Sequence, residues 1–247
     1  MNKFLSRALV SAALIVGAQA NASTIFDFQD LTDTSNGVIS GTWADGGVIS
    51  NVNTGERAFN SFDWTKNSIT LTASASYAGI NTYGDTYITH NGTAYSQGDA
   101  YKAWAYLDQG NAGLGVCTKG LKTQSGKGSN QCNPSSDDNV TENEILKINF
   151  DQLVSIDFTQ TIFRDGNHHA FNPNIDISLD GGNNWGLMNT GATLSSNSFY
   201  FRTNPVHSTN QFYIDSLAVS SVPEPGSLAL LGLGLMGLGF ARKLKAS

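Results

Sequence analysis

Strict alternation of apolar and polar residues is the feature that most constrains how this chain can fold. From Ile69 to Tyr77 every second residue is apolar (Ile69, Leu71, Ala73, Ala75 and Tyr77), and each residue between them is Ser or Thr. Successive side chains of a strand point to opposite faces of its sheet, so this pattern predicts a strand with one face on a core. No long stretch has helical spacing, and the sequence therefore predicts an all-β fold.

Other short segments predict further strands. Asn91-Gly92 lies between 87–89 and 93–95 and predicts a hairpin, because this dipeptide accepts the two positive φ values of a type I′ turn. Asp151-Gln152 is interpreted as a tight connection between two strands. The remaining strands are expected at 25–28, 37–40, 47–50, 101–107, 113–117, 145–150, 153–163, 174–180, 199–202 and 212–219. This many short strands favours a two-sheet antiparallel β-sandwich of the jelly-roll or lectin-like type, with an irregular β-barrel as the alternative.

The N-terminal segment, residues 1–22, has the pattern of a secretory signal peptide. A basic start with Lys3 and Arg7 precedes an apolar stretch over 8–18 and the small residues around Ala20-Asn21-Ala22. We expect signal peptidase to cleave after Ala22, with Ala20 as the alternative. The β domain then covers residues 23–221, and residues 222–247 form a separate tail.

The tail consists of three successive parts. Pro223, Glu224 and Pro225 come first, and the two prolines favour an extended backbone. An uncharged Gly/Leu run over 228–241 follows and is expected to form a single apolar helix in a bilayer. Arg242, Lys243 and Lys245 form a basic end, the kind of sequence that stays on the cytoplasmic side of a membrane.

In this order the tail resembles the PEP-CTERM sorting signal of Gram-negative bacteria. The resemblance implies that an exosortase-type membrane transpeptidase removes the tail near the Pro-Glu-Pro triplet, with Glu224 as a recognition element. It also implies a transient anchor in the inner membrane, followed by delivery to the cell surface or the extracellular polymer matrix. The alternative is an ordinary C-terminal membrane anchor.

Several segments of the body are similar to a β-sandwich that recurs in PEP-CTERM proteins. They are Gly113-Leu114-Gly115-Val116, Asp138-Asn139, Glu144-Ile145-Leu146 and Tyr213-Ile214-Asp215. This resemblance implies a fold and no defined activity.

The composition of the body limits its partners. Residues 23–222 contain nine Lys or Arg and 19 Asp or Glu, a net charge of −10. Such a body repels nucleic acid and anionic lipid, so we expect no nucleic-acid partner. The two cysteines, Cys117 and Cys132, are expected to form a disulfide in an exported chain, because a metal site would need more Cys or nearby His.

Calcium is the metal that the sequence favours, because Ca²⁺ takes oxygen ligands from acidic loops. One candidate site is the cluster Asp137, Asp138, Asn139, Glu142 and Glu144. Sandwich modules also often tie their first and last strands with one ion, which would use Asp27 or Asp30 together with Asp215. A solvated acidic turn is the alternative for both.

No residue pattern in the chain points to an enzyme. There is no G-x-S-x-G elbow, H-E-x-x-H helix or P-loop, and we interpret His168-His169 as solvated loop residues. The expected function is therefore a non-enzymatic exported protein with a structural or adhesive role. The alternative is a carbohydrate-binding module for exopolysaccharide, and a secreted hydrolase is less favoured. Sugar platforms for the module could come from Trp43, Trp64, Trp104, Trp185, Tyr83, Tyr87 and Tyr95.

Overall fold

The computed structural model describes residues 23–33, 37–44, 47–52, 55–77, 87–90, 93–96, 103–118, 132, 138–207 and 211–222. The segment Ser23–Ser221 forms one compact unit. The expected signal peptide and the expected apolar helix of the tail lie outside the described residues. Within the described part of the chain, no helix is both long enough and apolar enough to cross a membrane.

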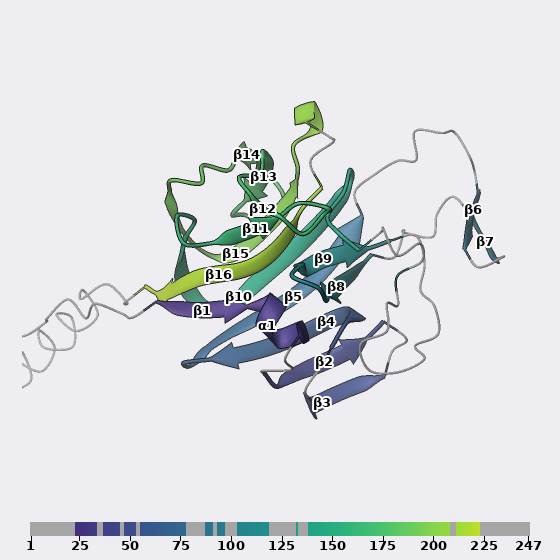
Figure 1. Cartoon of the computed structure of the whole chain (residues 1–247), viewed down its shortest axis with the longest axis horizontal. Coiled ribbons are helices and arrows are strands. Elements are labelled where there is room, and N and C mark those ends of the chain that lie inside the picture. The colour runs from purple at the N-terminus through teal and green to yellow at the C-terminus, as the bar shows by residue number, and fades with distance from the viewer. Residues whose placement is uncertain are drawn as a thin grey trace, which may run out of the picture. The chain divides into compact units, whose positions relative to one another are not determined.

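In the described residues the elements follow one another as strands with a single short helix and one 3₁₀ turn (Figure 1). They are β1 (Thr24–Asp27), α1 (Phe28–Asp33), β2 (Ile39–Trp43), β3 (Val48–Val52), β4 (Arg57–Lys66), β5 (Ile69–Tyr77), β6 (Tyr87–His90), β7 (Thr93–Ser96), β8 (Trp104–Asp108), β9 (Gly113–Cys117), β10 (Glu144–Asp157), β11 (Ile162–Arg164), β12 (Ala170–Phe171), β13 (Ile175–Ser178), β14 (Gly186–Leu187), β15 (Thr193–Thr203), η1 (Pro205–His207) and β16 (Tyr213–Ser221). The all-β class is confirmed.

Of the strands that the structure describes, all except β6 and β7 belong to one sheet of 14 strands, and part of this sheet closes on itself. The closed path runs β16-β9-β8-β4-β5-β10 and returns to β16, so these six strands form a barrel. The remaining strands extend the sheet beyond the barrel in three groups. Strands β1, β11 and β12 lie on the β16 side. Strands β15, β13 and β14 continue from β10, and β2 and β3 continue from β4. The described strands therefore do not form the two separate sheets of the expected sandwich. Their topology is closer to the alternative, an irregular β-barrel.

The long strand β10 closes the barrel. Its first half pairs with β5, from Glu144↔Tyr77 to Phe150↔Leu71, and its second half pairs with β16, at Val154↔Ser221 and Ile156↔Val219. The expected tight turn at Asp151-Gln152 is wrong. The strand continues through these residues, and a register shift between Asn149 and Val154 accommodates them as an irregularity of the pairing with β15.

The hairpin predicted around Asn91-Gly92 is confirmed as the separate pair β6–β7. Its register runs from Tyr87↔Ser96 to His90↔Thr93.

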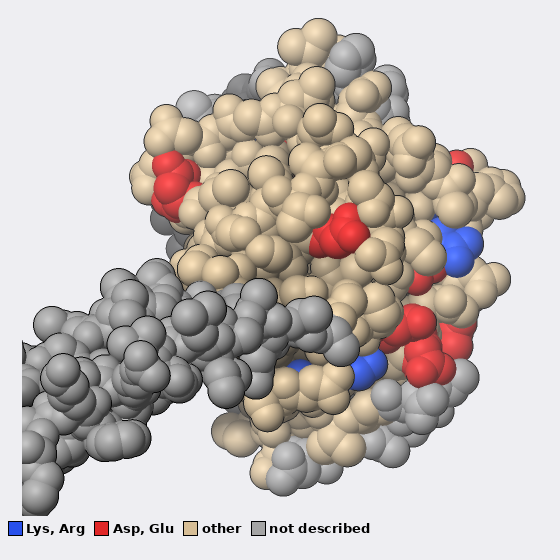
Figure 2. Space-filling view, turned by 90° about the vertical axis from the view of Figure 1, so that its left-hand side faces the viewer, with Lys and Arg blue, Asp and Glu red and all other residues tan. Residues whose placement is uncertain are grey.

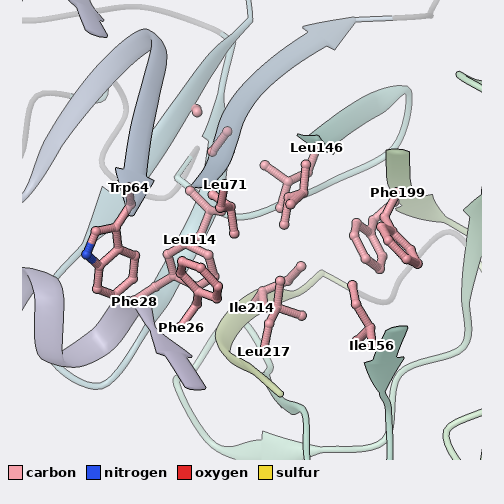
Figure 3. Packing of buried hydrophobic residues seen from close by; sticks show 14 of the residues in the cluster. Phe26, Phe28, Trp64, Leu71, Leu114, Leu146, Ile156, Phe199, Ile214 and Leu217 are labelled. Atoms are coloured by element: carbon pink, nitrogen blue, oxygen red, sulfur yellow. The ribbon is translucent and has the colours of Figure 1, made fainter. Parts of the chain in front are cut away.

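The inner faces of the strands form one hydrophobic core. Phe26, Trp64, Leu114, Leu146 and Phe199 come from five different strands and converge on the same interior (Figure 3). Aromatic rings meet edge-on within it: the centroids of Phe26 and Trp64 are 5.4 Å apart, and those of Phe150 and Phe199 are 5.9 Å apart. The apolar half of each alternating strand thus fills the core, as the sequence predicts.

The helix α1 was missed by the sequence analysis. The side-chain carboxylate of Asp27 accepts a 2.7 Å hydrogen bond from the backbone N–H of Asp30 and caps the helix N-terminus. Phe28 and Leu31 then reach the core from successive turns. Six residues are too few to show a helical period, so the segment looked like a continuation of the first strand.

Candidate functional site

The sheet carries a second, polar interior on the outer side of β8, β9 and β16. All five residues of β8 and all five of β9 are buried, although only alternate residues can face the main core. On β8 the outward positions are Trp104, Tyr106 and Asp108. On β9 the outward positions paired with Asp108 and Tyr106 are Gly113 and Gly115. A Cβ at Gly115 would collide with the backbone carbonyl of Asp138, so glycine lets this segment lie directly on the strand.

Three buried carboxylates gather on this side of the sheet, and each contacts at least one polar side chain. The Tyr106 hydroxyl donates a 2.8 Å hydrogen bond to Glu56, and the Tyr213 hydroxyl donates a 2.5 Å bond to Asp138. Asp108 lies 3.3 Å from Nε2 of His168. We call this set of six residues the carboxylate cluster: Glu56, Tyr106, Asp108, Asp138, His168 and Tyr213.

Burial and mutual repulsion change the protonation of the carboxylate cluster. Loss of solvent raises the pKa of Asp108 from 3.8 to about 8, and the negative charges of Asp138 and Glu56 add to this shift. Burial also raises the pKa of Glu56, against the hydrogen bond from Tyr106. Asp108 is therefore mainly protonated at neutral pH, which reduces the repulsion among three acidic groups held in one place.

His168 belongs to this cluster, contrary to the interpretation of both histidines as solvated. It has a positive φ of 66° in the turn between β11 and β12. Its Nδ1 lies 2.7 Å from the carbonyl oxygen of Gly110, and its ring meets Tyr213 edge-on at 5.4 Å. His169 points away from the cluster, with 79% of its side chain exposed.

The predicted disulfide between Cys117 and Cys132 is present, with the two Cα atoms 5.9 Å apart. Both cysteines are fully buried and pack with Trp104 and Tyr106 on the same outer side of the sheet. The bond therefore fixes Cys132 against the end of β9, beside the carboxylate cluster.

The first candidate calcium site is only partly described, because Asp137 lies outside the described residues. Asp138 contacts Tyr213, as above. The Glu144 carboxylate accepts hydrogen bonds from the Thr118 hydroxyl at 2.6 Å and from the Thr141 N–H at 2.7 Å. Glu142 is exposed, and Asn139 is buried with its amide donating to Gln211 at 3.0 Å. Asp138 and Glu144 thus direct oxygens at protein donors, whereas the buried side-chain oxygen of Asn139 has no hydrogen-bond partner in the described part of the chain.

The second candidate calcium site brings together the strands that the sequence analysis named. β1 pairs with β16, and Asp27 is close enough to Asp215 to contribute to a raised pKa there, where burial is the main cause. Arg164 occupies the position expected for a cation, with Nε 2.6 Å from the Asp215 carboxylate. Among the described residues, no three His, Cys, Asp or Glu side chains are grouped closely enough to hold a metal ion. Calcium binding stays a prediction.

The predicted aromatic platforms are divided between the interior and the surface. Trp64 and Trp104 are buried, at 3% and 8% exposure. Trp43 and Trp185 are half-buried, and an arginine lies over each ring: Arg57 at 3.7 Å and Arg202 at 4.2 Å. Tyr83 and the side chains of Tyr87 and Tyr95 lie outside the described residues.

The outer side of β5, β10 and β15 forms a second candidate site, which the sequence analysis missed. Here the outward residues are partly exposed and mostly small and polar, and we call this surface the open face: Thr70, Thr72, Ser74, Ser76, Lys147, Asn149, Ser198, Tyr200 and Arg202. The Ser198 hydroxyl donates to Asn149 at 2.8 Å, and the Lys147 amino group lies 5.5 Å from the centre of the Tyr200 ring. An aromatic ring beside hydroxyl and amide groups can stack on a sugar and hydrogen-bond its hydroxyls.

Sequence comparison identifies the tail. Residues 221–243 match the PEP-CTERM protein-sorting motif, which contains Pro223, Glu224, Pro225, Arg242 and Lys243. No curated protein and no solved structure matches the chain. The sorting motif thus supports export and sorting to the cell surface, with processing by exosortase-type machinery, while these triplet and basic residues lie outside the described part of the chain.

Proposed function

We propose that this chain is an exported, non-enzymatic β-barrel protein that is delivered to the cell surface or the extracellular matrix and has a structural or adhesive role there. The observation that carries the proposal is the position of the sorting motif. The match begins at residue 221, where β16 ends, so the signal follows the last strand directly. The 23–221 unit is then the cargo, and the tail supplies its delivery.

The contacts of the carboxylate cluster support a structural role for these acidic groups. Glu56 and Asp138 each accept a hydrogen bond from a buried tyrosine, and Asp108 contacts His168. Glu56, Asp108 and Asp138 are each at most 6% exposed, so a substrate would have to displace the covering segments to reach them. Satisfied and buried polar groups of this kind stabilise a fold and fix its geometry.

The sorting step is tested by replacing Pro223, Glu224 and Pro225 with alanine in the producing organism. Export should continue, while mass spectrometry of the mature protein should find the tail still attached. The control replaces the exposed Pro205 and Val206 with alanine, which should leave processing unchanged. Normal tail removal in the triplet variant would contradict the proposal.

The second candidate function is binding of exopolysaccharide, and the open face favours it. Tyr200 is half-buried and lies next to Lys147, and Asn149 and Ser198 provide amide and hydroxyl groups nearby in the register. This face keeps polar groups available to a ligand, in contrast to the buried carboxylates.

Affinity electrophoresis of residues 23–222 in gels that contain the organism's own exopolysaccharide tests this second function. Tyr200→Ala should abolish any retardation of the protein by the polymer. Trp43→Ala is the matched control, since this aromatic is also half-buried but packs against the hydrophobic core, with Arg57 over its ring. Equal retardation of the wild type and the Tyr200 variant would exclude the open face.

A further inference from the structure

Both ends of the body leave the fold at the same place. β1 and β16 are antiparallel, with Thr24 opposite Val219 and Asp27 opposite Ser216 (Figure 1). The first residue of the body, Ser23, therefore lies beside the end of β16. We call this end of the body the exit pole.

The tail is attached to the exit pole by a short connection. β16 ends at Ser221, and the apolar run of the tail begins at Leu228. The six residues between them span at most about 20 Å when fully extended. The headgroup layer on one side of a bilayer takes up roughly 5–8 Å of this length. While the apolar run is inserted in a membrane, the exit pole must lie close to the lipid surface.

Exposed aliphatic side chains flank β16 between Ser216 and this pole, with Ile162 the farthest from its end. Ile25 lies opposite Ala218 on β1, Ile162 opposite Ser216 on β11, and Leu153 precedes the pair Val154↔Ser221. The exposed fractions of these three residues are 40%, 41% and 49%, and their neighbours Phe26, Phe163 and Val154 are buried in the core. The strand alternation therefore directs all three side chains outward.

The acidic groups near the exit pole are held in local hydrogen bonds. The left-hand side of Figure 1 faces the viewer in Figure 2, where the visible described surface is mostly neither acidic nor basic apart from one acidic patch near its centre and another at its upper left. The acidic groups of β10 nearest to Leu153 are bonded locally: Asp151 accepts from the Thr70 N–H, and Asp157 accepts from Thr159 and Gln160. The amino group of Lys66 donates to the Ile25 carbonyl at 2.7 Å. Hydrogen bonds, first of all from the Thr159 hydroxyl, lower the pKa of Asp157, so this carboxylate keeps its charge and the face suits zwitterionic rather than strongly anionic lipid.

We propose that the exit pole is a membrane-contact surface, and that Ile25, Leu153 and Ile162 rest on the lipid headgroup region while the sorting tail is still attached. The proposal rests on the membrane insertion of the tail, which is part of the proposed function. It adds an orientation: the exit pole faces the bilayer, and the processing enzyme meets the Pro-Glu-Pro triplet against this surface. The open face, on other parts of the strands, need not contact lipid.

Fluorescence quenching in vesicles tests this orientation on the full chain. A cysteine introduced at Ile162 can be labelled selectively, because the two native cysteines are joined in a disulfide. The labelled chain is reconstituted into vesicles of phosphatidylethanolamine with a minor share of phosphatidylglycerol and a spin-labelled lipid. We expect at least threefold stronger quenching at Ile162 than at Val206 or Val48, two equally apolar controls that are 82% and 84% exposed. A label at Leu153 repeats the measurement if the first variant folds poorly.

Two outcomes separate this proposal from the one on which it rests. If the intact chain does not float with the vesicles, membrane insertion of the tail fails and the orientation fails with it. If the chain floats but the pole and control labels are quenched equally, the orientation alone is wrong. A flexible 20-residue insertion after Val222 should reduce quenching of a label at Ile162. In a second variant the insertion is combined with Ile25→Ser, Leu153→Ser and Ile162→Ser, and the label is placed at Ser220. Quenching at Ser220 should then fall to the level of the control labels.

Discussion

Two regions of the barrel's outer surface differ in burial and in chemistry. One is the outer side of β8 and β9, and the other is the outer side of β5 and β10. On β8 and β9 all residues are buried, and charged groups lie beneath segments that arrive from distant parts of the chain. On β5 and β10 buried and partly exposed residues alternate, and the outward residues are mainly Ser, Thr and Asn. The difference shows that a strand's own sequence decides which side faces the core, while remote segments decide whether the other side meets water.

The largest contrast is expected for two glycines. Gly115→Ala would place a Cβ against the backbone of Asp138 and Asn139, so the segment covering β9 would have to move. We expect a loss of about 3 kcal/mol or more in unfolding free energy. Gly186→Ala, on the edge strand β14, meets nothing within 4 Å and should change stability by less than about 0.5 kcal/mol. Urea denaturation measures the unfolding free energy of both glycine variants. Equal values would show that the segment with Asp138 and Asn139 is not in tight contact with β9.

The carboxylate cluster should make stability depend on pH in an unusual direction. Because the pKa of Asp108 is raised to about 8, the folded state holds a proton that the unfolded chain releases between about pH 4 and pH 8. Stability should therefore fall as pH rises through this window, by up to about 1.4 kcal/mol per pH unit. The raised pKa of Glu56 acts in the same direction.

Asp108→Asn should flatten this slope in urea titrations at pH 5, 6.5 and 8. Asp180→Asn is the contrasting variant. Hydrogen bonds, first of all from the Asn184 N–H, lower the pKa of the exposed Asp180 to about 2, so its contribution is lost only as the pH falls below about 4. A wild-type slope that survives the Asp108 substitution would place the titrating group elsewhere.

The disulfide should contribute less than the covering contacts but enough to measure. Its cysteines are 15 residues apart, and closing a loop of that length stabilises the folded state by about 3 kcal/mol in the chain-entropy model. Thiol labelling of the denatured, unreduced protein should find no free cysteine, and the Cys117→Ala, Cys132→Ala variant should unfold at a lower urea concentration. An unchanged urea midpoint would mean that the segments over β9 stay in place without the disulfide.

The smallest contrast is expected between two tyrosine hydroxyls. Tyr213→Phe removes a buried donor to Asp138 and should cost about 2 kcal/mol. Tyr200→Phe, on the open face, should cost less than about 0.5 kcal/mol. Thermal denaturation of both variants at pH 7 provides the comparison, and similar costs would indicate that the open face is covered in solution.

The same contrast explains what could be predicted from the sequence. Strand Ile69–Tyr77 was predicted with its observed bounds, because one of its sides meets the core and the other meets solvent. The β8 sequence Trp-Ala-Tyr-Leu-Asp shows no such alternation, since both of its sides are buried. The cluster that covers β8 could not be predicted, because Glu56, Asp138 and His168 lie far apart in sequence and meet only through the barrel's closure. The signal that could have revealed it is the presence of bulky residues on both sides of one short strand.

The position of β16 has a consequence for how the chain folds. This strand pairs with β1, β9, β10 and β11, yet it comes last in sequence among the described strands. Bringing β1 and β16 together closes a loop of nearly the whole body, which is slow because of its entropic cost. Until residue 221 arrives, the emerging chain has unpaired edges at several strands and cannot complete its barrel. The sorting motif begins at residue 221, so the barrel becomes able to close only as the motif starts to emerge.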